Sequence, residues 1–144
     1  MKKNISILID EEIESPNGYV SYNLKELESL GTEYENIYIG DLIDYLKTDD
    51  IQPTLQKIID KIKLDGKLII KGPDILQMCW YCSRYNLDLP KFRYIVYNTG
   101  RKSCYSTEEI MIILGSIKNI EIISASYSNI YEYSIIIKKN EAKN

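Results

Sequence analysis

Histidine is absent from this 144-residue chain. Its absence removes the commonest general base and the commonest side-chain ligand of transition metals. Cysteine is scarce as well: there are three, an odd number, which fits a reducing compartment better than a disulfide scaffold. No apolar run approaches the roughly 18–20 residues that a membrane-spanning helix needs. These absences argue against histidine-dependent catalysis, a disulfide framework and a membrane span.

Cations are not in excess either, because the net charge is −3, which argues against non-specific binding to nucleic acid. The first four residues lead directly into a strand-like segment, without the apolar core of a signal peptide. We therefore expect a cytoplasmic protein with no nucleic-acid or membrane partner. With 44% hydrophobic and 27% charged residues, the chain should form one globular domain, residues 1–144.

The segment from Asn36 to Gly72 predicts a strand, a helix and a second strand. The apolar runs 37–40 and 67–70 are too short for helices and suit buried strands, and a short helical piece is expected at 41–46. A strand–helix–strand unit of this length makes a right-handed crossover, so the two strands should be parallel in one sheet.

The helix of this unit is indicated by apolar residues at spacings of three and four, Leu55, Ile58, Ile59 and Ile62. Asp50 is expected as its N-cap and Pro53 in its first turn, where a missing N–H costs nothing. Gly66 is expected at its end, where a left-handed residue is favoured.

The remaining elements are predicted from alternation, capping signals and turn residues. Ser106 and Glu109 form a capping box that begins a helix, with Tyr105 and Ile110 as a hydrophobic staple. The other predicted elements are strands at 5–10, 19–23, 120–125 and 131–138, a helical turn or two at 24–30, a helix at 74–86, and a short strand or loop at 92–105. The last two strands should form an antiparallel pair.

Four segments resemble motifs of small class I S-adenosylmethionine-dependent methyltransferases. Residues 37–46, IYIGDLIDYL, are similar to the family's "I-Y-A-S-H-x-L-E-H-L". Residues 62–70, IKLDGKLII, are similar to its "L-K-P-G-G-x-L-x-I", and 16–24, PNGYVSYNL, to its "P-G-Y-V-N-V-D-L". Tyr105 to Ile117 is similar to its "Y-x-x-E-E-L-x-x-L-L-x-x-G-F".

This resemblance implies an α/β fold, the Rossmann-like methyltransferase core. The family's sheet is doubly wound and has seven strands, but the distance from Asn23 to Ile37 is too short for the usual third strand and its helix. We therefore expect a mostly parallel sheet of about six strands, with a C-terminal antiparallel hairpin and a shortened N-terminal half.

The resemblance also implies where the cofactor would bind, and the residues there depart from the family. The glycine loop after the first strand is replaced by Asp10-Glu11-Glu12, whose carboxylates would repel the methionine end of S-adenosylmethionine. The ribose-binding aspartate becomes Asn23, and the end of the next family strand is Gly40-Asp41. In that region the family's histidines correspond to Asp41 and Tyr45, and its glutamate to Asp44.

Two functions follow from these departures. The leading hypothesis is a methyltransferase-like domain that has lost cofactor binding and acts as a non-catalytic structural or protein-interaction subunit, with no cofactor. The alternative is an active enzyme that uses S-adenosylmethionine to methylate a small molecule or a saccharide.

The acidic residues permit another interpretation. Asp10, Glu11, Glu12, Asp41 and Asp44 would share one crevice at the carboxyl ends of neighbouring strands, where a hard cation such as Mg²⁺ or Ca²⁺ could bind. Alternatively, Glu11 and Glu12 point to solvent and Asp41 caps the following helix. We favour the second interpretation and predict no metal site, because neither loop has a recognised metal-site spacing.

Cys79 and Cys82 form a C-x-x-C pattern that is typical of redox sites or of half a zinc site. A second pair and histidine are both missing, so a closed zinc site is not expected. On the predicted helix both cysteines share a face with Ile75 and Met78, which favours packing in the core.

Cations and aromatic rings alternate in the segment after this helix. Its residues are Lys91, Phe92, Arg93, Tyr94, Tyr97, Arg101 and Lys102. Such interleaving is typical of single-stranded nucleic-acid surfaces, but also of a solvated loop in a Tyr- and Lys-rich protein. Tyrosine and arginine carry much of the binding energy at protein interfaces. We predict a contact with a protein partner or a second copy through Phe92, Arg93, Tyr94, Tyr97 and Arg101.

Overall fold

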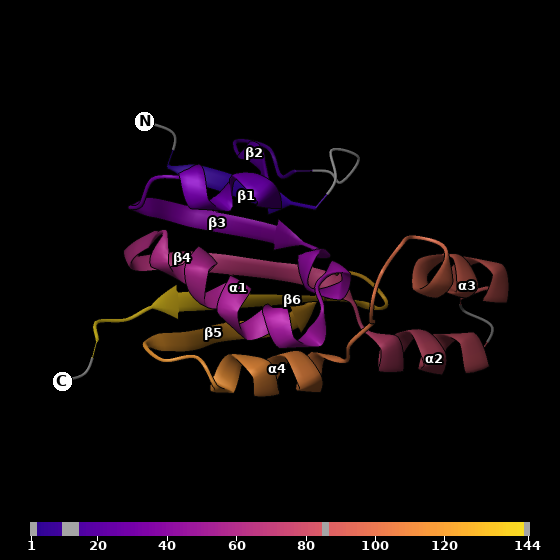
Figure 1. Cartoon of the computed structure of the whole chain (residues 1–144). Coiled ribbons are helices and arrows are strands. Elements are labelled where there is room, and N and C mark those ends of the chain that lie inside the picture. Colours follow the sequence, from indigo (N-terminus) through magenta and orange to yellow (C-terminus); the bar gives the residue numbers. More distant parts are fainter. Residues whose placement is uncertain (1–2, 10–14, 85–86, 143–144) are drawn as a thin grey trace.

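A computed structural model describes residues 3–9, 15–84 and 87–142. Its core is a six-stranded sheet of order β2-β1-β3-β4-β6-β5 (Figure 1). The strands are β1 (Asn4–Leu8), β2 (Val20–Asn23), β3 (Tyr34–Gly40), β4 (Ile62–Pro73), β5 (Ile120–Tyr127) and β6 (Glu132–Lys139). The first four pair in parallel, and β6 is antiparallel to both β4 and β5. The predicted six strands and the C-terminal hairpin are confirmed.

The helices lie on one side of the sheet and beyond its end. Their bounds are η1 (Leu24–Ser29) and η2 (Leu42–Tyr45), both 3-10, then α1 (Thr48–Asp60), α2 (Ile75–Ser83), α3 (Leu89–Tyr97) and α4 (Thr107–Gly115). In Figure 1, α1 and α4 cross the same face of the sheet, whereas α2 and α3 lie past the carboxyl end of β3. None of the described helices is both long and apolar enough to span a membrane.

The hydrophobic core fills the space between the sheet and α1 and α4. Alternate strand residues are fully buried there, among them Ile5, Ile37, Leu68 and Ile135. The other face of the sheet is polar at the same level, with Asn4, Asn36, Lys67 and Lys138 in register across four strands. The described part of the chain therefore has one core on one face, whereas the family's doubly wound sheet has helices on both.

Helix α1 begins and ends earlier than predicted. Lys47 is its N-cap, so Asp50 lies in the first turn and Pro53 in the interior of the helix. The acids Asp49 and Asp50 in that first turn interact favourably with the helix dipole, which supports the earlier start. At the other end the C-cap is Lys61, and the expected cap Gly66 belongs to β4 instead.

Gly66 is required inside β4 for a steric reason. A Cβ at this position would lie 2.5 Å from the Ile62 Cγ2 atom and 2.8 Å from the Glu35 carbonyl oxygen. We predict that Gly66→Ala lowers the free energy of unfolding by about 1–3 kcal/mol, the usual cost of overpacking. Urea denaturation measures the loss. The control is Gly115→Ala, where a Cβ would meet nothing within 4 Å, and an equal loss in both variants would contradict the prediction.

The segment predicted as a short strand or loop at 92–105 is largely helical, because α3 covers Leu89–Tyr97. Its aromatic and β-branched residues favour a strand, but Asp88 caps the helix by accepting a hydrogen bond from the Lys91 N–H at 2.7 Å. Pro90 occupies the first turn, where its missing N–H is not needed. These two start signals outweigh the β propensity of the residues that follow.

Asp74 joins α2 to α4. Its carboxylate accepts hydrogen bonds from the Gln77 N–H at 3.0 Å, the Thr107 N–H at 2.8 Å and the Thr107 hydroxyl at 2.5 Å. The Tyr127 hydroxyl donates a further one at 3.2 Å. The capping box of Ser106 and Glu109 forms as predicted at the start of α4.

Candidate functional site

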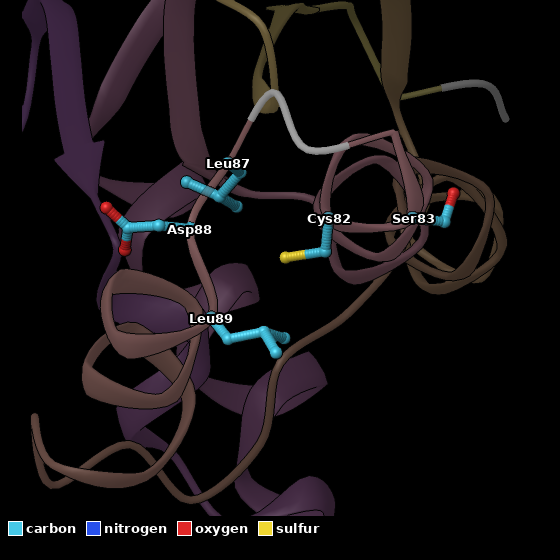
Figure 2. A pocket seen from close by; sticks show the side chains of 5 residues that line it. All are labelled: Cys82, Ser83, Leu87, Asp88 and Leu89. Carbon is cyan, nitrogen blue, oxygen red and sulfur yellow. The ribbon is translucent and has the colours of Figure 1, made fainter.

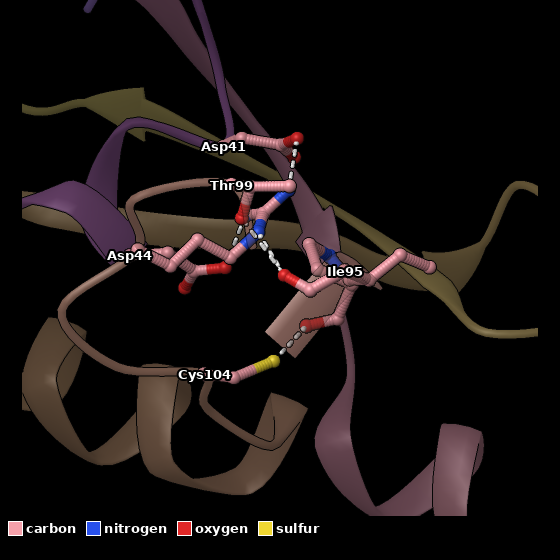
Figure 3. A network of polar contacts seen from close by, with 7 residues as sticks. Asp41, Asp44, Ile95, Thr99 and Cys104 are labelled. Carbon is pink, nitrogen blue, oxygen red and sulfur yellow. Dashed lines mark hydrogen bonds and ion pairs between the residues drawn. The ribbon is translucent and has the colours of Figure 1, made fainter. Parts of the chain in front are cut away.

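A charged cluster lies where β3 and β4 end. Asp41 follows β3 with a left-handed backbone (φ 58°), and Asp44 lies in η2 three residues later. Arg101, in the loop after α3, forms an ion pair with each of them. Figure 3 shows the network of polar contacts around Asp41 and Asp44. In an open α/β sheet, ligands bind beyond the carboxyl ends of the strands, so this cluster is the candidate site.

Arg101 binds both carboxylates at once. Its Nη1 donates to Asp44 Oδ2 at 2.6 Å and its Nη2 to Asp41 Oδ2 at 2.9 Å. Its Nε donates to the carbonyl oxygen of Ile95 at 3.1 Å, and the Cζ atom lies 5.2 Å from the centre of the Tyr45 ring. The side chain is only 7% exposed. The guanidinium thus ties the end of α3 to the loop that follows β3.

This position differs from the prediction for Arg101, which was a contact with a partner. Its side chain is inside the protein and is already paired with two carboxylates, so it is not available for a contact with a partner. The sequence offered no local signal for the pairing, because Arg101 is 57 and 60 residues from its two partners. Asp41 was expected to cap η2, but its side chain makes no capping hydrogen bond and pairs with Arg101 instead.

Asp44 is the buried member of the cluster, at 1% exposure. Its Oδ1 atom has no hydrogen-bond partner among the described residues, and its backbone carbonyl accepts from the N–H groups of Lys102 and Ser103. Burial raises the pKa of Asp44 to about 7; Arg101 partly offsets the rise and the nearby Asp41 charge adds to it. This carboxyl therefore exchanges its proton near neutral pH, unlike an exposed aspartate.

The other titratable groups at the cluster are poor nucleophiles. Burial raises the pKa of the Cys104 thiol to about 12, and the nearby Asp44 charge adds to the rise. Burial also holds the pKa of the Tyr133 hydroxyl well above its usual value. Both groups stay protonated at neutral pH, and the thiol donates a weak hydrogen bond to the Pro73 carbonyl oxygen at 3.7 Å.

Asn23, at the family's ribose-binding position, serves a local purpose in the structure. Its Oδ1 accepts from the Lys25 N–H at 2.9 Å, and its own N–H donates to the Glu26 carboxylate at 2.7 Å. Its Nδ2 donates to the Ile9 carbonyl oxygen at 3.4 Å. These bonds form a capping box for η1, so the amide oxygen is already engaged.

Of the other positions predicted to correspond to the family's cofactor site, Gly40 is described by the structure and the acidic residues after β1 are not. Gly40 ends β3, and a Cβ there would lie 2.9 Å from the Tyr38 hydroxyl, so this tyrosine lies over the strand end. Asp10, Glu11 and Glu12 lie outside the described residues. Within residues 3–9, 15–84 and 87–142, no group of three histidine, cysteine or acidic side chains could hold a metal ion.

A second feature, which we call the α2–α3 surface, lies beyond the sheet. It is defined by large apolar side chains that are exposed: Leu76 (59%), Trp80 (47%), Leu89 (58%), Tyr94 (59%) and Tyr97 (73%). Of the other predicted contact residues, Arg93 is exposed and Phe92 is half-buried. No residue of α3 is buried, so this helix presents most of its surface to its surroundings.

A hollow of about 410 Å³ opens between α2 and α3 (Figure 2). It is lined by Cys82, Ser83, Leu87, Asp88 and Leu89, and the Cys82 thiol points into it. Core packing was predicted for both cysteines, but Cys79 is exposed and Cys82 is half-buried. The prediction failed because α2 turns only its Met78 face fully toward the interior. Burial raises the pKa of Cys82, and Cys79 and Asp88 add to the rise, which disfavours a reactive thiolate.

Comparison with solved structures shows that the fold is that of S-adenosylmethionine-dependent methyltransferases. The chain is similar to magnesium protoporphyrin IX methyltransferase (ChlM) from Synechocystis PCC 6803 with bound SAH, with a TM-score of 0.56 and 17% identity. It is also similar to a SAM dependent methyltransferase from Archaeoglobus fulgidus, with a TM-score of 0.58 and 14% identity. A third similar structure is N,N-8-amino-8-demethyl-D-riboflavin dimethyltransferase (RosA) from Streptomyces davawensis, with a TM-score of 0.60 and 11% identity.

These matches cover most of this chain but differing shares of the three methyltransferases. They cover 90%, 95% and 85% of this chain in turn, but 55%, 86% and 35% of the three methyltransferases. This chain is thus equivalent to about half of the first and a third of the last. No protein-family model matches the sequence. No curated protein matches it either. At these identities the likeness concerns the fold alone.

Proposed function

We propose that this chain is a methyltransferase-like module that binds no S-adenosylmethionine and acts as a non-catalytic subunit through contact with a protein. The observation that carries the proposal is the position of Arg101. The residues that follow β3 at the family's site positions, Asp41, Asp44 and Tyr45, are all engaged by this one guanidinium. A cofactor or substrate that needed these side chains would have to displace a buried ion pair.

The capping role of Asn23 supports the same proposal. Recognition of a ribose needs an acceptor that can serve two hydroxyls, and an amide has one oxygen where a carboxylate has two. In this chain that oxygen already accepts the Lys25 N–H. In the sequence, Asp10-Glu11-Glu12 stands where the family has its glycine loop, and three acids are unfavourable to the methionine carboxylate of the cofactor.

The alternative function is an active methyltransferase acting on a small molecule or a saccharide, with S-adenosylmethionine as cofactor. One observation favours it: a carboxyl with a pKa of about 7, as Asp44 has, is suited to general-base catalysis. Asp44 also corresponds to the family's glutamate, and aspartate keeps its carboxylate. The solved structures with the same fold include ChlM with bound SAM.

Cofactor binding separates the two functions. We predict that S-adenosylmethionine and S-adenosylhomocysteine produce neither heat in titration calorimetry nor a rise in melting temperature. A ligand present at about 100 times its dissociation constant stabilises a protein by about 2.7 kcal/mol, so micromolar binding would be easily detected. An active S-adenosylmethionine-dependent methyltransferase measured in the same buffer is the positive control. Micromolar binding to this chain would refute the proposal in favour of the enzyme.

The contact that we assign to this module is the α2–α3 surface. Arg93, Tyr94, Tyr97 and the half-buried Phe92 keep the role predicted for them, and Trp80 joins them as a large exposed aromatic residue. The occupant is a partner protein or a second copy of the chain.

All three cysteines are free thiols, which supports a reducing cytoplasm as the compartment.

A further inference from the structure

The α2–α3 surface is basic, whereas the rest of the protein is acidic. Residues 75–105 contain five lysines and arginines and a single aspartate, a net charge of +4, and the remainder of the chain carries −7. One of the five, Arg101, is buried and paired with Asp41 and Asp44, so it adds no charge to the surface. The exposed cations in this segment are Arg84, Lys91, Arg93 and Lys102. Among the described residues, none of these four forms an ion pair with a carboxylate. The surface therefore has positive charge left to offer a partner.

The one carboxylate among the described residues that line the hollow is already engaged within the protein. Asp88 accepts the Lys91 N–H at 2.7 Å as the N-cap of α3, so its charge is directed at the helix N-terminus. The rest of the lining includes two leucines and the Cys82 thiol. A hollow of about 410 Å³ with this lining accommodates one or two large apolar side chains of a partner.

Arg84 directly follows Ser83, which lines the hollow, and it pairs with Trp80 in a geometry suited to binding carboxylates. The Arg84 guanidinium stacks on the Trp80 ring, with its Cζ atom 3.8 Å from the ring centre. Stacking fixes the plane of the guanidinium and leaves its N–H edge available to a carboxylate. Within the described part of the chain, the guanidinium makes one hydrogen bond to a side chain, a long one of 3.4 Å from Nη1 to the Ser83 hydroxyl.

From this geometry we infer that the α2–α3 surface binds an acidic protein segment, which places an apolar side chain in the hollow and carboxylates against Arg84, Lys91 and Arg93. The inference rests on the proposed function, because it assigns a partner chemistry to the contact named there. A polypeptide fits better than nucleic acid or an anionic membrane. The leucine-lined hollow selects a discrete side chain, and the acidic remainder of the protein opposes approach to an extended polyanion.

Selection from a random dodecapeptide display library on the full chain tests this inference. We expect the selected peptides to be rich in aspartate and glutamate around one or two Leu, Ile, Phe or Trp residues. Synthetic versions are then titrated while the emission of Trp80 is followed, since this is the single tryptophan of the chain and lies on the surface in question. Binding should shift its emission and should weaken as salt is added.

Charge reversal supplies the matched controls. Lys91→Glu with Arg93→Glu should weaken binding of the selected peptides at least tenfold. Lys25→Glu with Lys118→Glu makes the same change in net charge at two exposed positions away from this surface and should leave binding unchanged. Replacing the apolar residue of a selected peptide by serine should also abolish the shift of Trp80 emission.

Several outcomes would overturn the inference. The selected peptides could be neutral or basic, or no peptide could be selected at all. The two charge-reversed variants could weaken peptide binding equally. Finally, the wild-type protein could sediment with phosphatidylserine vesicles while the Lys91→Glu/Arg93→Glu variant does not. The last result would assign the surface to a membrane. Titration of the same protein preparation with S-adenosylmethionine distinguishes failure of the proposed function from failure of this inference. Binding of S-adenosylmethionine refutes the proposed function, whereas the peptide and vesicle results above refute only the acidic partner.

Discussion

Replacing Arg101 by methionine is expected to lower the free energy of unfolding by about 3–5 kcal/mol, the usual cost of removing one partner from a buried ion pair. The guanidinium is 7% exposed and lies 2.6 Å from the Asp44 carboxylate and 2.9 Å from that of Asp41. Methionine fills a similar volume but supplies neither charge nor N–H groups. Both carboxylates then lose their counter-charge, and the Ile95 carbonyl oxygen loses a donor.

Urea unfolding followed by Trp80 fluorescence measures this loss, with Arg93→Met as the matched control. Arg93 is exposed and forms no ion pair among the described residues, so its replacement should change the stability by less than about 0.5 kcal/mol. Arg101→Lys should give an intermediate loss, because an ammonium cannot hold two carboxylates in the fork geometry of a guanidinium. Equal stabilities of Arg101→Met and Arg93→Met would show that the cluster contributes nothing to folding.

The second large effect is a dependence of stability on pH that comes from Asp44. Burial raises the pKa of this carboxyl to about 7 in the folded protein, whereas an unfolded chain releases the proton near pH 4. Between these values the folded state binds the proton and the unfolded state does not. The stabilisation by Asp44 is therefore fully present below about pH 4 and is lost as the pH rises through about 7. Three pKa units bound the loss at about 4 kcal/mol.

Asp44→Asn should remove this dependence. The amide is neutral at every pH, can still accept from Arg101, and leaves the Arg101–Asp41 pair in place. We expect the variant to show a flatter profile of unfolding free energy between pH 4 and 8, and to be at least as stable as the wild type at pH 8. Asp41→Asn is the control: it keeps the Asp44 carboxyl and removes a like charge, so the transition should shift to lower pH without disappearing. An unchanged slope in Asp44→Asn would contradict this assignment.

Asp74 makes the stability depend on pH in the opposite direction to Asp44, and at lower pH. Burial alone would raise its pKa, but the hydrogen bonds from Thr107, Gln77 and Tyr127 outweigh burial and hold the pKa below its usual value. Its stabilisation is therefore present above the pKa of an unfolded aspartate and is lost as the pH falls below it. The free energy of unfolding of the wild-type protein, plotted against pH, should have its maximum between the pH ranges in which Asp74 and Asp44 titrate.

The fold of this protein follows in large part from patterns that extend over a few residues. The short apolar runs at 5–10 and 67–70 predict strands, and the structure has strands there with Ile5, Ile7, Leu68 and Ile70 buried. The capping box that begins α4 lies within four residues, so the sequence specifies it directly. The short distance from Asn23 to Ile37 predicted the missing third strand, and the sheet has six strands.

Element boundaries depended on contacts that the sequence does not display. Gly66 has the appearance of a helix cap, yet it lies in β4, where Ile62 and the Glu35 carbonyl leave no room for a Cβ. Residues 89–97 have strand propensity, yet Asp88 and Pro90 begin a helix there. Local propensity differs between states by about 1 kcal/mol or less per residue, so a cap or a packing contact can reverse it.

The sequence by itself determined the fold class, the departures from the methyltransferase cofactor motif and the concentration of rings and cations after residue 75. Only the tertiary structure decided what became of them. It buried Arg101 against Asp41 and Asp44 while leaving Trp80, Tyr94 and Tyr97 exposed. Side-chain partners 57 and 60 residues apart are set by how the chain crosses the sheet, whereas periodicity and capping act within one or two turns of a helix.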